Sequence, residues 1–305
     1  MRVLIFGAGA MGSVFGGFLS RTTDVVLVGR NPHVKAVREH GLRVSGIWGE
    51  HLFRPDARTT LEDLGLFDTV FITTKAYDTP TAVREVLLHL TPQGTVITMQ
   101  NGIGNEEAVA EVVGRDRTMG GMAIFGARLV APGHVEVTVY ASECRVGPLA
   151  GGLERAVKLA ETLSRAGIPT LPTGEIVREK WMKAFYNIAL NPLSAVLRVP
   201  YGFLGEHEET RGLMKSLLKE AFAVARAQGA ELEMDWEEYF RYLLERQLPP
   251  TAGHRSSMLQ DLERGRRTEI DYLNGAIVGL GKRKGIKTPV NETIVRIVKA
   301  LEAMV

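Results

Sequence analysis

The chain has 305 residues, of which 45% are hydrophobic and 24% are charged. At about 150 residues per domain, this length favours two domains that each bury a core, and it excludes a small disulfide-stapled fold. The formal net charge is only +2. The one dense cationic group, at residues 264–267, is flanked by acidic side chains, so we expect no nucleic-acid partner.

The cysteine and histidine content indicates the cellular compartment and bears on metal binding. Cys144 is the single cysteine, which excludes an intrachain disulfide and fits a cytoplasmic protein. The seven histidines form neither an HExxH motif nor a Cys/His cluster, so no metal site is expected. No segment reaches the ~20 apolar residues that span a bilayer, and the glycines from Gly7 to Gly17 argue against a signal peptide at the N-terminus. We therefore expect no membrane partner.

The N-terminal segment has the order strand, glycine-rich turn, helix, strand. Residues 3–6 form a short apolar run typical of a buried parallel strand, a helix follows to residue 19, and residues 24–28 form a second strand. In this context the turn is expected to bind the pyrophosphate of a dinucleotide at the helix N-terminus. The residues of that turn are Gly7, Ala8, Gly9, Ala10, Met11 and Gly12.

The end of the second strand indicates which dinucleotide binds. NAD-binding domains usually place an acidic residue there to hold the ribose hydroxyls. This chain has Gly29-Arg30-Asn31 instead, and a guanidinium can bind a 2′-phosphate, so Arg30 favours NADP(H). The alternative is that Arg30 is an ordinary surface residue.

Two further strands, at residues 68–74 and 95–99, are followed by Lys75 and Asn101. Ligands of open α/β sheets collect at the carboxyl ends of the strands, so both side chains are expected to face cofactor or substrate, unless they are ordinary turn residues. A hairpin near residues 130–134, a strand to residue 147, a helix over 151–166 and a short strand over 167–171 complete this half. The predicted cofactor domain therefore covers residues 1–172.

Residues 173–305 change to helical periodicity and are expected to form a helical substrate domain with a cleft beside the first domain. Its candidate helices cover residues 175–197, 206–229, 235–247, 255–265, 269–284 and 289–304.

Within the first of these helices, Lys183, Asn187 and Asn191 are four residues apart and share one face. A cation and two amides on an otherwise apolar helix suit a substrate that has a carboxylate, a carbonyl and a hydroxyl, although a structural polar network explains them equally well. Pro192 predicts a kink after Asn191. Further along, Thr268 could cap a helix.

Five segments and the single residue Arg30 together resemble the ketopantoate reductase family. They are GAGAMG at 7–12 with Arg30, TTKAYDT at 73–79, QNGIGNEE at 100–107, KWMKAFYNIALNPLSAV at 180–196 and SSMLQDLERGRRTEIDYLNG at 256–275. The resemblance covers nearly the whole chain. It implies an α/β fold, with an N-terminal Rossmann-type parallel-sheet domain followed by an all-helical C-terminal domain.

The same resemblance implies NADPH-dependent reduction of 2-dehydropantoate to pantoate in coenzyme A biosynthesis. Hydride would pass from NADPH to the ketone carbon, with Lys183 as catalytic proton donor. Asn187, Asn191 and Ser257 would join Lys183 in binding the substrate. The cofactor would be bound by Gly7 to Gly12, Arg30, Lys75, Asn101, Ala127 and Glu269, the last of these where cofactor and substrate meet.

The chain departs from the family pattern at two positions. Tyr201 stands where some members have a further substrate-binding asparagine, and Asp78 follows Lys75 where some have glutamine. Reduction of a different 2-oxo acid and a non-catalytic NADP(H)-sensing role are therefore the alternatives. The apolar faces of the last three predicted helices leave room for a homodimer.

Overall fold

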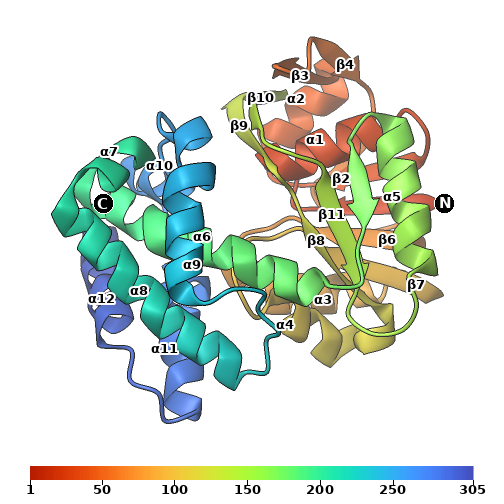
Figure 1. The fold of residues 1–305 in the computed structure, drawn as a ribbon. Helices are drawn as coiled ribbons and strands as arrows, with labels where there is room; N and C mark the ends of the chain where they lie inside the picture. Colours follow the sequence, from red (N-terminus) through yellow and green to blue (C-terminus); the bar gives the residue numbers. More distant parts are fainter. Residues whose placement is uncertain (305) are drawn as a thin grey trace. The chain divides into compact units, whose positions relative to one another are not determined.

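The computed structural model describes residues 1–304, and the chain divides into two compact units (Figure 1). Unit 1 comprises Met1–Asn101 and Asn105–Ile176, and unit 2 comprises Gly102–Gly104 and the chain from Val177 onward. Unit 1 ends at Ile176 and unit 2 continues from Val177, within the first turn of a long helix. The boundary predicted from the sequence was after residue 172.

Unit 1 alternates strands and helices. In chain order its elements are β1 (Arg2–Phe6), α1 (Ala10–Leu19), β2 (Asp24–Val28), α2 (His33–His40), β3 (Leu42–Gly46), β4 (His51–Phe53), β5 (Asp56–Arg58), β6 (Phe67–Ile72), η1 (Ala76–Asp78), α3 (Thr79–Leu87), β7 (Leu90–Thr98), α4 (Asn105–Val113), η2 (Arg115–Arg117), β8 (Thr118–Met122), β9 (Phe125–Ala131), β10 (His134–Tyr140), β11 (Cys144–Pro148), α5 (Glu154–Ala166) and β12 (Thr170–Pro172).

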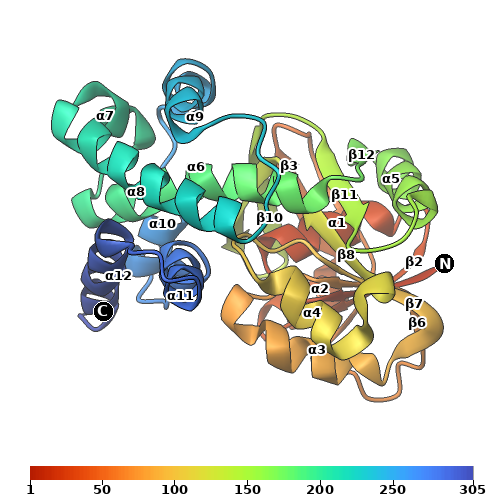
Figure 2. The same cartoon turned by 60° about the horizontal axis from the view of Figure 1, so that its bottom comes forward.

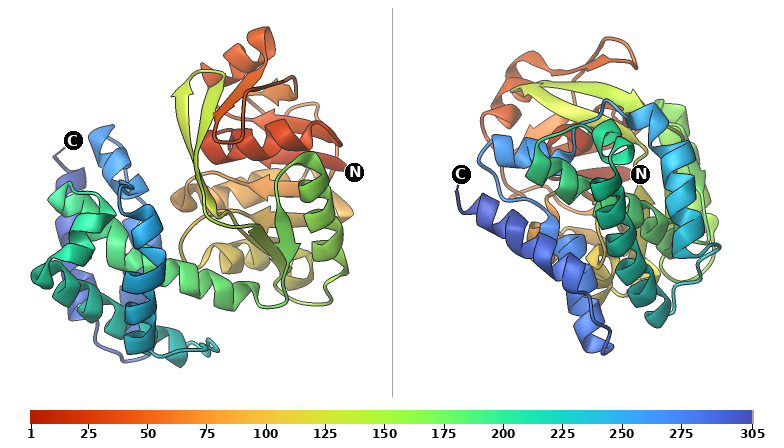
Figure 3. Two further views of the ribbon diagram at one scale, coloured as in Figure 1. Left: turned by 45° about the horizontal axis from the view of Figure 1, so that its top comes forward. Right: turned by 60° about the vertical axis from the view of Figure 1, so that its left-hand side comes forward.

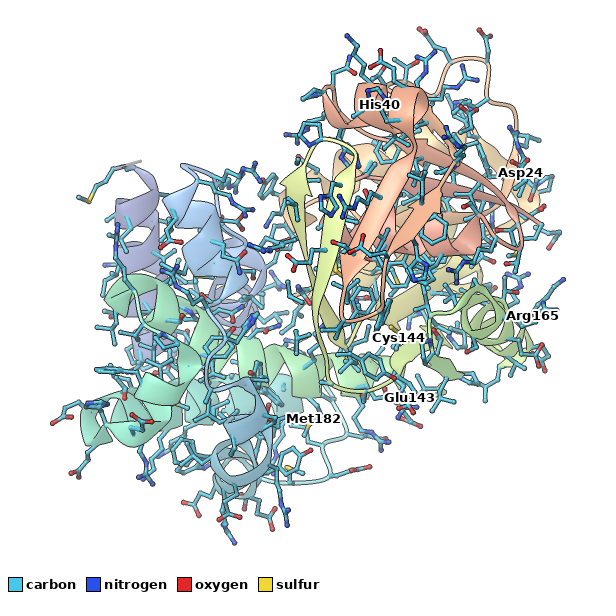
Figure 4. All side chains as sticks on the ribbon, turned by 90° about the horizontal axis from the view of Figure 1, so that it is seen from above. Asp24, His40, Glu143, Cys144, Arg165 and Met182 are labelled. Atoms are coloured by element: carbon cyan, nitrogen blue, oxygen red, sulfur yellow. The ribbon has the colours of Figure 1, made fainter. Side chains whose placement is uncertain are left out.

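The main sheet has the strand order β12-β11-β8-β7-β6-β1-β2-β5. All its pairings are parallel except β11 with β8, which is antiparallel. Cys144, labelled in Figure 4, is fully buried on β11. The predicted fold class, a parallel α/β sheet followed by helices, is confirmed.

Helices cover both faces of this sheet, so its strands are apolar on both sides. On β1, Ile5 packs in a core shared with α1 and α5, while Leu4 packs in a second core with α3 and α4. The helices α3 and α4 lie side by side in Figure 2. Because the strands are buried on both faces, they appear in the sequence as continuous apolar runs.

A second, smaller sheet with the order β4-β3-β10-β9 was not predicted. The hairpin of β9 and β10, expected from the turn at residues 130–134, forms its outer part and is drawn yellow-green in Figure 3. The strand β3 pairs with β10 in parallel, with Arg43 opposite His134. This pairing joins segments far apart in the chain, which no local pattern reveals.

Unit 2 is helical. Its elements are α6 (Ile176–Leu197), which begins at the end of unit 1, α7 (Tyr201–Glu206), α8 (Glu208–Ala227), α9 (Trp236–Tyr242), η3 (Leu243–Gln247), η4 (Pro249–Thr251), α10 (Ser257–Glu263), η5 (Ile270–Tyr272), α11 (Asn274–Arg283) and α12 (Pro289–Glu302). All six helices expected from the sequence are present within slightly different bounds, whereas α7 was not predicted as a separate helix. Among residues 1–304, no helix is long and apolar enough to span a membrane.

The helix α6 continues through Pro192, where a kink was expected. Proline has no N–H, so the carbonyl of Ile188, four residues earlier, loses its usual helical partner. The side-chain Nδ2 of Asn274 donates a hydrogen bond to that carbonyl at 3.2 Å, and Asn274 is fully buried. Satisfying this carbonyl removes part of the cost of keeping proline inside the helix.

Candidate active site

The glycine turn between β1 and α1 leaves one open backbone face. Gly7 has φ of +112°, and a Cβ atom there would lie 2.5 Å from the Thr74 nitrogen. A Cβ at Gly12 would lie 2.4 Å from the Gly7 carbonyl oxygen. A Cβ at Gly9, in contrast, would meet only that oxygen, at 3.9 Å. Gly7 and Gly12 are therefore required by packing, whereas Gly9 borders free space.

That free space adjoins the N-terminus of α1. Gly9 is the N-cap residue, it supplies no side-chain cap, and the first helical turn carries no acidic residue. The turn is tied to the end of β2, because Gly7 and Ala8 both donate their N–H groups to the Val28 carbonyl, at 2.9 and 2.8 Å. A fixed helix N-terminus with an open backbone face suits an anion such as a pyrophosphate.

Arg30 follows directly after the end of β2 and is exposed. Its guanidinium forms no ion pair with any part of the chain that the structure describes. Arg58 lies at the end of the neighbouring strand β5, opposite Val28, but its guanidinium bonds the Asp56 carboxylate at 2.9 and 3.1 Å. Of the two arginines, Arg30 is the one whose charge is not already paired.

Lys75 and Asn101 follow β6 and β7, and a single buried side chain links their turns. Gln100 is 6% exposed. Its Nε2 donates to the Thr74 carbonyl at 3.0 Å and to the Thr79 hydroxyl at 2.8 Å. Gln100 immediately precedes Asn101, and its side chain bonds Thr74, which immediately precedes Lys75. Gln100 therefore fixes the Lys75 turn and the Asn101 turn next to each other. This role of Gln100 was not predicted, although a glutamine between a buried strand and a glycine turn is a signal for it.

The neighbouring contacts extend this arrangement. Thr98 donates its hydroxyl to Gln100 Oε1 at 2.8 Å, and Asn105 Nδ2 donates to the Asn101 carbonyl at 2.9 Å. Thr98 and Asn105 are both fully buried. Ala127, the remaining predicted cofactor residue of unit 1, is half-buried on β9 opposite Val137 of β10.

In unit 2, α6 carries the predicted polar stripe on a helix otherwise buried in the core. Phe185 stacks on Phe222 with ring centroids 4.0 Å apart. Lys183 is half-buried, and Asn187 is 9% exposed. The Asn187 amide makes no hydrogen bond within residues 1–304. Its polar atoms keep some contact with solvent, so the amide is available to bond a ligand.

Asn191, one turn further along α6, is partnered. Its Oδ1 accepts a hydrogen bond from the Tyr201 hydroxyl at 2.5 Å, and its backbone carbonyl accepts one from Ser256 Oγ at 3.2 Å. Ser256 is the N-cap of α10, since its Oγ also accepts from the Leu259 N–H at 3.0 Å. Ser257, the next residue, is exposed in the first turn of α10, so the segment that carries it is held against α6 at Asn191.

Glu269 lies on a segment that is fixed by the last helix. Thr268 donates its N–H and its hydroxyl to Glu302 Oε1 at 2.7 and 2.6 Å, and its hydroxyl accepts from the Ile270 N–H at 3.2 Å. Asp271 bonds Lys299 at 2.6 Å. The N-cap residue of the short 3₁₀ turn η5 is the half-buried Glu269, which makes no side-chain cap, so Thr268 bonds the turn from one residue before its cap, and Glu302 of α12 holds the segment that carries Glu269.

A hollow of about 550 Å³ also lies on unit 2, and none of the predicted site residues lines it. Its walls are formed by Gly205, Arg211, Lys215, Trp236, Glu237, Phe240, Arg241, Leu244, Glu245 and Leu248. Among residues 1–304, no group of three or more His, Cys, Asp or Glu side chains could hold a metal ion.

The fold and these residues define a two-unit protein with a dinucleotide-type α/β unit and a helical unit bearing a lysine and two asparagines. Two family models match the chain: "Ketopantoate reductase PanE/ApbA" over residues 3–151 and "Ketopantoate reductase PanE/ApbA C terminal" over residues 175–302. The chain belongs to the ketopantoate reductase family, which confirms the resemblance.

Individual relatives agree over the full length. The 2-dehydropantoate 2-reductase of Aquifex aeolicus is 38% identical, covering 99% of this chain and 97% of the relative. The crystal structure of a ketopantoate reductase from Ralstonia eutropha JMP134 is 30% identical with a TM-score of 0.90, covering 100% and 99% of the two chains. A D-mandelate dehydrogenase in a ternary structure with NADH and anilino(oxo)acetate has the same identity, TM-score and coverage.

Proposed function

We propose that this protein reduces 2-dehydropantoate to pantoate with NADPH, and that Lys183 donates the proton to the developing alkoxide. The observation that carries the proposal is the α6 stripe. Asn187 is a largely buried residue whose amide makes no hydrogen bond within residues 1–304, one turn from a half-buried lysine, in a chain whose relatives are named for this reaction. Such a pair of side chains suits a small oxygen-rich substrate.

The residues of unit 1 fit the cofactor. The open face at Gly9 admits a pyrophosphate, and the unpaired guanidinium of Arg30 favours a 2′-phosphate over free ribose hydroxyls. Lys75, Asn101 and Ala127 are proposed to contact the same cofactor. When bound, NADPH supplies the hydride.

The residues of unit 2 hold and protonate the substrate in this proposal. An ammonium at Lys183 stabilises negative charge on the ketone oxygen and delivers a proton to it. Asn187, Asn191 and Ser257 orient the carboxylate and hydroxyl groups, and such positioning can contribute strongly to the rate. Glu269 is proposed to lie where cofactor and substrate meet.

Lys183→Ala tests the catalytic assignment. We expect kcat for 2-dehydropantoate to fall by a factor of ~10² to ~10⁴, the usual contribution of a positioned acid, while the Kd for NADPH changes little. NADPH absorbance follows turnover, and a fluorescence titration gives the Kd. Lys219→Ala removes the same charge from an exposed position on α8 and serves as the control. Near-normal turnover by Lys183→Ala would refute the role of Lys183.

A second candidate function is reduction of a different 2-oxo acid. The observation that supports this second function is the structural similarity to a D-mandelate dehydrogenase whose structure contains NADH. Comparing kcat/KM for 2-dehydropantoate and for aromatic and aliphatic 2-oxo acids, each with NADPH and NADH, separates the two. Both relatives are named as oxidoreductases, so an enzyme is favoured over an NADP(H) sensor. Absence of turnover with all of these acids would favour the sensor.

A further inference from the structure

The Tyr201 side chain is buried against the candidate substrate residue Asn191. It is 3% exposed, and its backbone N–H donates to the His254 carbonyl at 3.0 Å, which fixes the start of α7. Its hydroxyl lies 2.5 Å from Asn191 Oδ1, at the short end of ordinary O–H···O hydrogen bonds. Tyr201 is therefore a buried partner of Asn191 and is not itself open to a ligand.

The chemistry of the phenol determines how the Asn191 amide is turned. Burial raises the pKa of Tyr201 well above its usual range, so the hydroxyl keeps its proton. A buried hydroxyl proton needs an acceptor, and within residues 1–304 Asn191 Oδ1 is the only one it reaches. The opposite amide orientation would leave that proton unpaired.

With Oδ1 held by Tyr201, the Nδ2 amino group of Asn191 must face the other way. Asn191 is 5% exposed, and its Nδ2 makes no hydrogen bond to any residue that the structure describes. Its backbone carbonyl is also fixed, by Ser256. The outcome is a rigid donor beside Ser257 and on the same helical face as Asn187 and Lys183.

We infer that Tyr201 is a positioning residue that fixes Asn191 as an obligatory hydrogen-bond donor to a substrate oxygen. This inference rests on the proposed function. It predicts that the position selects a substrate group that accepts hydrogen bonds, namely the carboxylate or the 4-hydroxyl of 2-dehydropantoate, and disfavours a group that can only donate.

Tyr201→Phe tests the inference by removing one oxygen. Once released, the amide can present either end to the substrate, so we expect KM for 2-dehydropantoate to rise ~10-fold, a factor equivalent to ~1.4 kcal/mol, with kcat and the KM for NADPH little changed. Tyr186→Phe is the matched control. Tyr186 is half-buried and packs edge-on against the Tyr201 ring, its pKa is raised to about 12, and its hydroxyl bonds Thr251 Oγ1 at 2.7 Å and makes no hydrogen bond to Asn191 within residues 1–304.

Two further measurements separate positioning from general packing. In an Asn191→Ala background, Tyr201→Phe should add no further rise in KM, because the residue acts through Asn191. Asn191→Asp keeps an acceptor for Tyr201 but presents an oxygen to the substrate in place of an amino group, so its KM should rise at least as much. 3,3-Dimethyl-2-oxobutanoate, which lacks the hydroxyl, distinguishes the two substrate oxygens: the effect of Tyr201→Phe persists if Asn191 meets the carboxylate and vanishes if it meets the hydroxyl.

An unchanged KM in Tyr201→Phe or in Asn191→Asp, or an equal rise in Tyr186→Phe, would overturn this role while leaving the proposed function intact. A wild-type protein that reduces no 2-oxo acid would overturn the proposed function and this role with it.

Discussion

Gly9→Ala tests where the diphosphate of the cofactor lies. The Gly9 backbone, with φ of −81° and ψ of −163°, is in a region open to alanine, and the added methyl would meet only the Gly7 carbonyl oxygen at 3.9 Å. Replacing glycine where the backbone already suits alanine raises the free energy of unfolding by about 0.4 to 1 kcal/mol, through the unfolded chain. Gly9 is also the N-cap of α1, where alanine is less favourable than glycine, so the two effects oppose each other and the folded protein should be about as stable as the wild type.

The same methyl occupies the face that a pyrophosphate must approach. We expect the Kd for NADPH to rise ~10-fold or more, which corresponds to at least ~1.4 kcal/mol of lost binding. Fluorescence titration with NADPH measures the Kd, and urea denaturation of the free protein measures the free energy of unfolding.

Gly12→Ala is the matched comparison, because its methyl would lie 2.4 Å from the Gly7 carbonyl oxygen and 2.6 Å from Thr73 Oγ1. Overpacking of this kind costs about 1 to 3 kcal/mol of stability. Wild-type NADPH affinity in Gly9→Ala would refute the placement of the diphosphate. A loss of stability in Gly9→Ala as large as in Gly12→Ala would refute the claim that space is open there.

Three further predictions concern unit 1 and the pH dependence of stability. Gln100→Leu leaves buried polar groups at the Lys75 and Asn101 turns without partners, so it should lower the free energy of unfolding by about 2 to 4 kcal/mol and raise the Kd for NADPH, whereas unaltered cofactor binding would show that the turns keep their geometry without it. Arg30→Asp should shift the kcat/KM ratio from NADPH toward NADH, and an unchanged ratio would mean that another group contacts the 2′-phosphate. Burial lowers the pKa of His33 and His254 below 6.5. Below pH 6.5 the unfolded chain then binds more protons than the folded one, so the free energy of unfolding should be highest above pH 6.5 and decrease as the pH falls below it. A free energy of unfolding from urea denaturation that stays constant from pH 7 to 5 would contradict this.

The parts of the fold predicted from sequence are those fixed by short-range patterns. The glycine turn, the hairpin of β9 and β10 and the helices of unit 2 follow from local periodicity and from residues such as Gly7, whose backbone only glycine adopts easily. The pairing of β3 with β10 depends on segments distant in the chain, so it gave no local signal. The sequence around Pro192 did not show how the helix tolerates this proline, because the compensating donor, Asn274, lies on α11.

The sequence predicted which residues form the candidate site, but not which of them are bonded within the protein and which are left to bind a ligand. From spacing alone, the stripe of Lys183, Asn187 and Asn191 is equally a structural polar network or a substrate site. The structure separates its two amides: Asn191 Oδ1 is bonded by Tyr201, and Asn187 has no partner in the described chain. The partner of the Asn191 amide, Tyr201, lies on another element, α7. The sequence of α6 alone does not show where α7 packs, so it could not show this hydrogen bond.

Asn274 shows what a purely structural amide looks like in the same helical unit. It is fully buried, its Nδ2 donates to both the Ile188 carbonyl at 3.2 Å and Asn291 Oδ1 at 3.0 Å, and its Oδ1 has no hydrogen-bond partner within residues 1–304. An amide kept only for the fold would be expected to resemble Asn274, with its donors paired inside the protein. Asn187 on α6 differs, because neither end of its amide bonds another group within residues 1–304 and its polar atoms keep some contact with solvent, which leaves them available to a substrate. For this reason Asn187, neither end of whose amide is bonded within the described chain, argues for a ligand at α6 more strongly than Asn191, of which only Nδ2 is unbonded.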